Sequence, residues 1–223
     1  MHKYRADGAL GSSWHPYVHG EEVAPPIQED ETAIVVFMFS QYFTAQNDPS
    51  LLKDFYGSMI VPMANFLTEF VDQSTGLPKP SYDLWEEYYM VTTYSTAVTY
   101  AALLAASDLA GIAGDDSHAV QWRTAADDIK AAAEKHLFNE ERNTFYKGIF
   151  TDNHRFDKDT TIDASAIFGA SLFGLFESDS PKLTAAVKTL KEAFTYSQQR
   201  PGLPRYENDP YRRTSDDVSG NWW

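Results

Sequence analysis

The chain has 223 residues, of which 43% are hydrophobic and 14% aromatic, a composition typical of a globular protein with a sizeable core. Its formal net charge of −14, from 18 basic and 32 acidic side chains, argues against nucleic acid and anionic membranes as partners and suits a neutral ligand. Because cysteine is absent, the sequence offers no disulfide, thiolate nucleophile or zinc-cysteine cluster.

The first residues, Met-His-Lys-Tyr, lack the apolar core of a signal peptide, and the sequence shows no run of about 18 apolar residues that would cross a bilayer. We therefore expect no membrane partner and slightly favour a cytoplasmic location. Export of a longer parent protein stays open.

Helical spacing of apolar residues, with capping and breaking residues at the ends, predicts four helices in the first part of the chain. They span about 30–46, 50–71, 87–109 and 117–137. The third is almost wholly apolar, whereas the fourth is amphipathic and begins at Asp115 and Asp116.

The rest of the chain continues this alternation. Residues 143–150 predict a short strand or hairpin, 161–176 are apolar and rich in small side chains, and Ser180-Pro181 opens an amphipathic helix to about 197. An apolar helix followed by a more polar one is what the inner and outer rings of an α/α toroid require, because only the outer ring faces water. We predict an all-α fold with three such pairs.

The loop at 76–87 packs three carboxylates and two aromatic residues into a proline-stiffened segment. A glycosidase holds one carboxylic acid protonated near neutral pH by placing it against apolar surface with a second carboxylate nearby. The pair Glu86-Glu87 alone also fits an ordinary helix start, where acidic side chains favour the helix dipole. The longer segment decides between the two interpretations.

Residues 82–87, Tyr-Asp-Leu-Trp-Glu-Glu, closely resemble the catalytic-acid motif of the bacterial glucoamylase-like enzymes, glycoside hydrolase family 15. Four further segments are similar to family segments and follow in family order. They are residues 4–8 and 26–33 upstream, and 205–209 and 220–223 downstream. The resemblance implies a six-hairpin (α/α)6 toroid, so three hairpins make roughly half of it. We expect residues 1–223 to be a single partial catalytic domain that starts and ends inside the fold.

The resemblance implies that Glu86 is the general acid and that Glu87 contacts substrate. Asp83 would help to keep the acid protonated, and Trp85 would supply apolar surface. Tyr82, at the start of the same motif, is also expected to bind substrate.

Two further residues are expected to bind substrate, each with an alternative role. Arg205 matches the family arginine that binds sugar hydroxyls, but it would also fit a surface ion pair with Asp209 or Glu207. Asp30 matches an acid of the family's Gln-x-Asp segment, and it would fit a helix N-cap as well as a site residue.

No metal site is predicted. His15 and His19 lack the context of a zinc motif, and the acidic run from Asp157 to Asp163 lacks the glycine and glutamate of a calcium loop. Asp163 is predicted instead to cap a helix on the active face.

The sequence thus predicts part of an inverting, exo-acting α-glucosidase that acts on α-glucan or oligosaccharide ends without a cofactor. In the family the general base lies beyond the last matched segment, so we expect this chain alone to be inactive. Trehalase-type or glucodextranase-type specificity stays open, as do a phosphorolytic relative and a non-catalytic glucan-binding module. Half a toroid would also expose apolar inner-helix surface, which predicts self-association.

Overall fold

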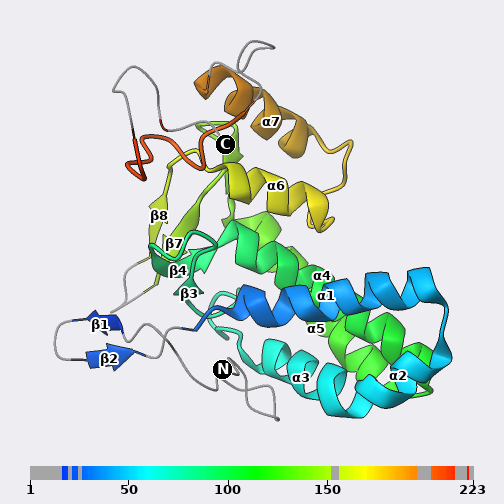
Figure 1. Ribbon diagram of the computed structural model, residues 1–223. Helices are drawn as coiled ribbons and strands as arrows, with labels where there is room; N and C mark the ends of the chain where they lie inside the picture. The colour runs from blue at the N-terminus through cyan, green and yellow to red at the C-terminus, as the bar shows by residue number, and fades with distance from the viewer. Residues whose placement is uncertain are drawn as a thin grey trace.

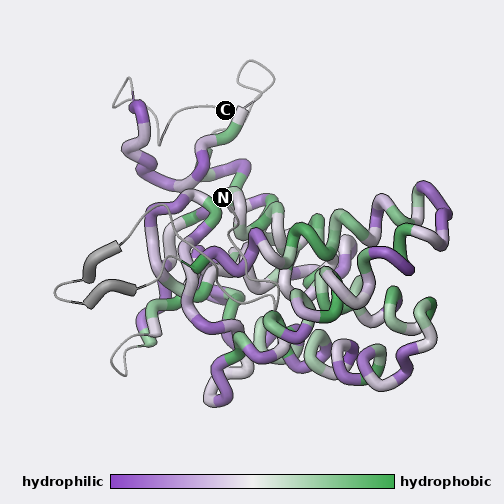
Figure 2. The backbone as a smooth tube through the Cα atoms, turned by 60° about the horizontal axis from the view of Figure 1, so that its bottom comes forward, coloured by the Kyte–Doolittle hydropathy of each residue, from purple (hydrophilic) through white to green (hydrophobic). Residues whose placement is uncertain are grey.

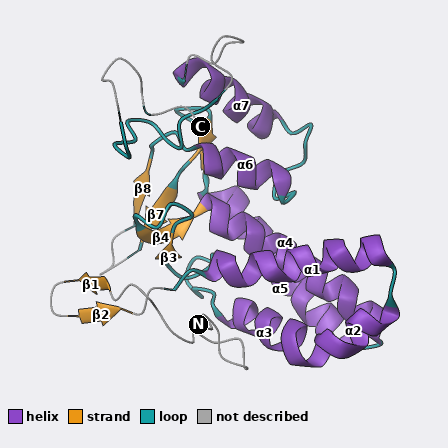
Figure 3. Cartoon of the chain, viewed as in Figure 1, coloured by secondary structure: helices purple, strands orange, loops and turns teal. Residues whose placement is uncertain are grey.

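The computed structural model describes residues 27–151, 156–194, 202–213 and Gly220, together with the backbone of two short paired strands, β1 (Tyr17–His19) and β2 (Glu22–Ala24). The motif residues 4–8 and 221–223 lie outside the described residues. Helices form most of the structure, and a small sheet lies at one end of them (Figures 1 and 3).

Three apolar helices form the inner layer: α1 (Glu29–Gln46), α4 (Thr93–Ala113) and α6 (Ala164–Leu172). The central helix α4 packs on both α1 and α6. All three begin at the end where the sheet lies, as Figure 1 shows. The loops before the inner helices therefore meet on one face.

Each inner helix is followed by a partner that packs back on it, and the partners of α4 and α6 are more polar than those two helices. The partners are α2 (Pro49–Phe55), the π-helical turn η1 (Tyr56–Ile60) and α3 (Val61–Glu69) after α1, α5 (Asp116–His136) after α4, and α7 (Pro181–Ala193) after α6. The three predicted helical hairpins are confirmed, but in the first of them α3 is no more polar than α1. The helix expected over 50–71 is three consecutive segments, because η1 interrupts its regular hydrogen bonding.

The helix boundaries follow from residues that satisfy the free backbone groups at helix ends. The side chains of Asp48, Asp115, Asp163 and Ser180 each accept a hydrogen bond from an amide in the first turn of the helix that follows. Asp163 is thus the predicted cap. At α1 the N-cap is Gln28, with no side-chain capping bond, so the prediction of Asp30 as an N-cap is wrong.

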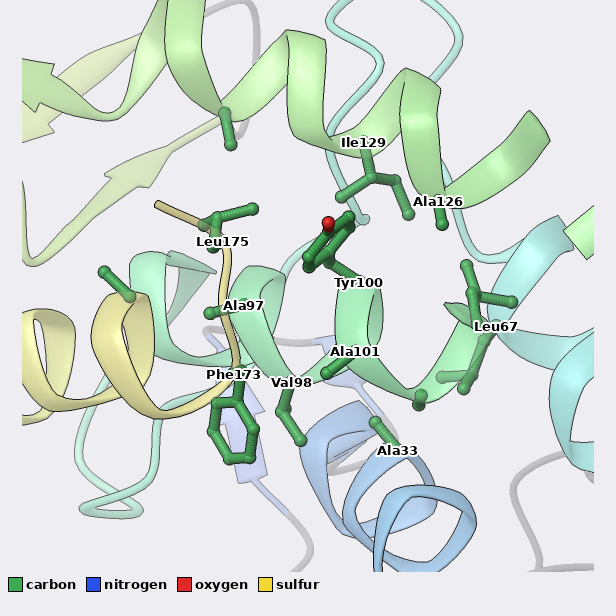
Figure 4. Close-up of a cluster of buried hydrophobic side chains, with 14 of the residues drawn as sticks. Ala33, Leu67, Ala97, Val98, Tyr100, Ala101, Ala126, Ile129, Phe173 and Leu175 are labelled. Carbon is green, nitrogen blue, oxygen red and sulfur yellow. The ribbon is translucent and has the colours of Figure 1, made fainter. Parts of the chain in front are cut away.

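The core lies where α4 meets α1, α3, α5 and α6. In Figure 4, Ala33 of α1 faces Val98 and Ala101 of α4, and Ile129 of α5 lies on the opposite side of that helix near Tyr100. Figure 2 shows the hydrophobic stretches of the chain where the helices pack together. Contrary to the sequence-based expectation, α4 is long and apolar enough to cross a membrane, but most of it is buried as the central helix of this fold.

A four-stranded antiparallel sheet covers the end where the inner helices begin. Its strand order is β3 (Ser81–Tyr82), β4 (Tyr89–Thr92), β7 (Gly148–Phe150) and β8 (Asp157–Asp159). A second antiparallel pair joins β5 (Phe138–Asn139) to β6 (Thr144–Phe145). The strands β6 and β7 lie within the region 143–150 that was predicted to be a short strand or hairpin.

The helix predicted to start at 87 begins only at Thr93, so that prediction is wrong. Residues 89–92 are instead the strand β4, which pairs with β3 and β7. Thr92 then caps α4 by accepting a hydrogen bond from the amide of Ser95 at 2.9 Å. The pairing of β4 with a strand more than fifty residues later overrides the local helical pattern.

Large apolar side chains are exposed on the two outermost inner helices. Met38 and Tyr42 on α1 are 56% and 54% exposed, and Phe168 and Leu172 on α6 are 56% and 52% exposed. These are the faces that further hairpins of a toroid would cover. Self-association through them stays a prediction.

Candidate active site

The two glutamates of the motif lie in the tight loop that joins β3 to β4. The carbonyl of Asp83 accepts a hydrogen bond from the amide of Glu86 at 2.8 Å, and the Asp83 amide donates to the carbonyl of Tyr88 at 2.9 Å. Asp83 Oδ1 also accepts from the amides of Glu87 and Tyr88, at 2.7 and 3.1 Å. The backbone and the carboxylate of Asp83 thus hold this loop in its conformation.

Glu86 stands at the turn of this loop with φ +59°, the left-handed region that non-glycine residues seldom adopt. Such a conformation costs about 1 kcal/mol or more and persists where the surroundings impose it, often at functional sites. The side chain of Glu86 is exposed. Glu86 is therefore an exposed residue at a strained position of the loop.

The carboxylate of Glu87 joins the motif loop to the segment at 205–209, 118 residues later. Glu87 Oε1 accepts from Arg205 Nη2 at 2.7 Å, and Oε2 accepts from the hydroxyl of Tyr206. Burial, reinforced by the hydrogen bond to Glu87, raises the pKa of Tyr206 well above its ordinary value, which keeps the hydroxyl a donor. Charge-assisted bonds of this kind are among the stronger hydrogen bonds in proteins.

Arg205 is gripped from the other side by Asp209. Its Nε and Nη2 each donate to one oxygen of that carboxylate at 2.7 Å. The alternative pairing with Asp209 is therefore present together with the contact to Glu87, while Glu207 binds Arg142 instead. Asp209 is fully buried, so this is an internal rather than a surface pair. The hydrogen bonds from Arg205 to Asp209 contribute most to raising the pKa of the guanidinium, which stays charged.

Aromatic side chains line a cavity beside this network. The guanidinium carbon of Arg205 lies 5.2 Å from the Trp85 ring centroid and 4.6 Å from that of Tyr211. The cavity has a volume of about 420 Å³ and is lined by Trp85, Ala164, Leu203, Pro204, Arg205 and Tyr211. A mostly apolar wall with one fixed cation is suited to binding the face and hydroxyls of a sugar.

A buried charged cluster lies beneath the loop. Lys147 Nζ lies 3.6 Å from Asp83 Oδ2 and 3.5 Å from Asp163 Oδ2. Asp163 Oδ2 also accepts from Trp85 Nε1 at 3.0 Å, which fixes the indole. Burial raises the pKa of both aspartates, and Lys147 opposes that rise.

A second acidic pair begins helix α1. Glu29 is buried, and its Oε1 accepts from the Thr99 hydroxyl of α4 at 2.9 Å. Burial raises the pKa of Glu29 well above its ordinary value, and the charge of the adjacent Asp30 adds to this. Asp30 is also buried, and its charge contributes to raising the pKa of Tyr94, for which burial is the main cause.

Tyr82 lies between the two groups. It is buried in β3, its ring centroid is 5.2 Å from that of Tyr89, and its amide donates to the carbonyl of Ile27 at 2.7 Å. The stem of the β3–β4 hairpin therefore contacts the start of α1, while its loop carries Glu86 and Glu87.

The structure thus brings Arg205 into contact with both Trp85 and Glu87. Glu86 stands between these two in the loop, which the Asp83 carboxylate holds. Asp30 and Tyr82 lie toward the start of α1 instead. Sequence reasoning missed Lys147 as a site residue and assigned no site role to Tyr206 or Asp209. The only available signals were a lone lysine in a predicted strand and the positions of the other two within the Arg205 segment.

Within the described residues, no group of three histidine, cysteine or acidic side chains is placed to hold a metal ion. The carboxylate of Asp163 instead caps α6, accepts from Trp85 and lies beside the Lys147 ammonium. His15 and the side chain of His19 lie outside the described part.

Glu29→Gln is expected to make stability less dependent on pH. Because burial raises the folded pKa of Glu29, the folded chain keeps a proton on this carboxyl over a pH range in which the unfolded chain has released it. The cost is absent below the unfolded value of 4.5 and grows by about 1.4 kcal/mol per pH unit as the pH rises toward the folded value. Thermal unfolding at about pH 4 and pH 7 should show the variant to be more stable, relative to the wild type, only at pH 7. An equal difference at both pH values would contradict this assignment.

The fold is that of solved glycosidases. A bacterial glucoamylase complexed with acarbose matches with a TM-score of 0.65 and 19% identity, over 89% of this chain and 30% of that one. A rhamnosidase from Klebsiella oxytoca with rhamnose bound matches with a TM-score of 0.60 and 15% identity, over 84% of this chain and 35% of that one. The described helices are thus part of an α/α toroid of the kind found in these glycosidases.

Residues 3–223 match the sequence profile of the Glycosyl hydrolases family 15, and the chain belongs to this family. An uncharacterized glycosyl hydrolase of Methanocaldococcus jannaschii is 25% identical over 218 residues, which are 98% of this chain and 32% of that protein. The chain therefore spans about a third of the length of this relative. The family predicted from the motif at 82–87 is confirmed.

Proposed function

We propose that the chain carries the general-acid side of the active site of an inverting, exo-acting α-glucosidase of the glucoamylase type. The observation that supports this best is the ion pair of Glu87 with Arg205, because Glu87 follows Glu86 directly in the chain. In this proposal Glu86 donates a proton to the glycosidic oxygen of the leaving sugar. Asp83 holds the loop that presents it.

Arg205 and Glu87 would bind hydroxyls of the sugar next to the cleaved bond. Asp209 and Glu87 occupy Nε and Nη2 of the guanidinium, and within the described part of the chain no acceptor binds Nη1. The hydrogens of Nη1 are therefore available to a sugar oxygen. Trp85 would pack against the sugar ring, held in place by its bond to Asp163.

Tyr82 and Asp30 were expected to bind substrate, but both are buried, so in this proposal they support the site from the start of α1. The general base would come from residues outside this chain. Inversion requires the two carboxyl groups to lie about 6.5–9.5 Å apart on opposite faces of the sugar. A sugar bound between them would cover Glu86, which is exposed here. The proposed substrate is the non-reducing end of an α-glucan or oligosaccharide, whose neutrality suits a chain of charge −14.

Calorimetric titration of the folded 223-residue chain with acarbose tests the sugar-binding half of this proposal. We expect saturable binding that Glu87→Gln weakens by about 10- to 100-fold, because hydrogen bonds to a charged group are worth about 1.5–3 kcal/mol. Glu134→Gln removes the same charge from an exposed position on α5 and should leave the affinity unchanged. Absence of binding, or equal effects of the two substitutions, would refute the proposed site. Binding without turnover in the polypeptide that also contains the base would favour a glucan-binding module.

A further inference from the structure

Lys147 is a buried cation at the junction of three elements. Its side chain is 3% exposed, although it carries a charge that water would solvate well. Its amide donates to the carbonyl of Asp159 in β8 at 3.0 Å, and its carbonyl accepts from the amide of Thr93 at the start of α4, at 3.1 Å. Both backbone groups thus fix the residue from which the side chain extends.

Gly148, the next residue, determines how closely the strand β7 packs against β4. A Cβ on Gly148 would lie 2.6 Å from the carbonyl oxygen of Val91 and 2.8 Å from Met90 Sδ. Only glycine allows β7 to approach β4 so closely. This close approach keeps the Lys147 side chain next to Asp83, the residue that holds the β3–β4 loop.

The ammonium contacts the supports of the motif loop. Asp83 faces it with Oδ2, while Oδ1 of the same carboxylate binds the amides of Glu87 and Tyr88. The ring centroid of Tyr206 lies 3.7 Å from Nζ and that of Tyr88 lies 4.7 Å away. Tyr206 in turn donates to the carboxylate of Glu87.

The other carboxylate at Lys147 belongs to Asp163, which holds the indole of Trp85 and caps α6. The Lys147 ammonium therefore contacts three residues that each hold another part of the site. Asp83 binds the loop of Glu86, Tyr206 binds Glu87, and Asp163 binds Trp85. No described hydrogen-bond acceptor lies within bonding distance of Nζ, so its contacts are ion pairs and ring faces.

We propose that Lys147 is a positioning residue, whose ammonium holds Asp83, Asp163 and Tyr206 in the arrangement that fixes the loop of Glu86 and Glu87. The catalytic meaning of that loop rests on the proposed function, but the positioning itself does not. Without the ammonium, two buried carboxylates would lie close together with no cation between them. A carboxyl that takes up a proton accepts hydrogen bonds more weakly, so the amides of Glu87 and Tyr88 would lose their anchor.

Lys147→Met tests this, because methionine keeps an unbranched apolar stem and removes the charge. Lys158→Met is the matched control, since Lys158 lies in the neighbouring strand β8 with its ammonium over the Tyr146 ring at 4.6 Å. Amide hydrogen exchange followed by NMR should be at least about tenfold faster at Glu87 and Tyr88 in Lys147→Met, with other protected amides unchanged. Lys158→Met should leave both rates as in the wild type.

The indole resonance of Trp85 gives a second readout, because its N–H donates to Asp163. The groups facing Lys147 are Asp83, Asp163, Tyr88 and Tyr206, with Asp209 contributing charge from farther away. Removing the cation raises the pKa of the aspartates, so the pH midpoint of this resonance should move upward by about one unit or more in Lys147→Met.

Unchanged exchange and an unchanged midpoint in a folded Lys147→Met would overturn the proposal. If that variant does not fold, Lys147→Gln, which keeps a hydrogen-bond donor, is measured in the same way. Failure of both variants to fold would assign Lys147 to fold stability alone and would also overturn it. Neither readout depends on sugar binding or cleavage. If the wild-type chain does not bind acarbose, that result counts against the proposed function and leaves this test of Lys147 intact.

Discussion

Glu86→Gln is expected to lower kcat for maltotetraose by about 10²–10⁴-fold in the longer polypeptide that we propose to contain the general base. Glutamine preserves the size of the side chain and the turn at this position but has no proton to give to the leaving oxygen. Because Arg205, Glu87 and Trp85 keep their contacts, acarbose affinity should change little. Anomer-resolved proton NMR measures the rate, and an inverting reaction releases β-glucose first.

Glu69→Gln, at the end of α3, is the control and should leave the rate unchanged. A rate for Glu86→Gln within twofold of the wild type would remove Glu86 from the acid position. The 223-residue chain alone should release no glucose. Rapid release of β-glucose by that chain, abolished by Glu86→Gln, would show instead that a base exists within these residues.

Asp209→Ala is expected to lower the free energy of unfolding by about 3–5 kcal/mol, because it removes one partner of a buried ion pair. Asp209 is fully buried, and both of its oxygens bind Arg205, which is itself 12% exposed. Its Oδ1 also accepts from the amide of Tyr211 at 2.9 Å. Urea denaturation followed by circular dichroism measures the loss, and acarbose binding should weaken as Arg205 loses its orientation.

Asp108→Ala is the matched control, because Asp108 forms a surface pair with Arg123 at 2.6 Å and is 66% exposed. That change should cost less than about 1 kcal/mol. Equal losses in the two variants would contradict the assignment of Asp209 to a buried, site-forming pair.

The effect of Asp209 also has a defined pH dependence. Burial raises the pKa of Asp209, but its hydrogen bonds with Arg205 and the Tyr211 amide outweigh this, so the folded pKa lies below the ordinary value of 3.8. The stabilisation is therefore fully present above that value and is lost as the pH falls through the folded pKa. The difference in the free energy of unfolding between wild type and Asp209→Ala should therefore disappear in acid.

Much of the fold was predictable because its signals are local. The spacing of apolar residues defined α1, α5 and α7, and capping residues such as Asp115 and Asp163 marked helix starts within a residue or two. The start of α4 was wrong by six residues, since the strand at 89–92 depends on pairing with β7, which no local pattern reveals.

By itself, the sequence determined the family, the order of inner and outer helices and the residue types of the acid motif, because these depend on short-range spacing and composition. Only the tertiary structure decided that Glu87 meets Arg205 118 residues away, and that Glu86 stands in a strained turn rather than at a helix start. It also decided that Lys147 is buried between two aspartates. A buried charge is stable only where the chain brings opposite charges to it, and here these come from the β3–β4 loop and the N-cap of α6, two other parts of the fold.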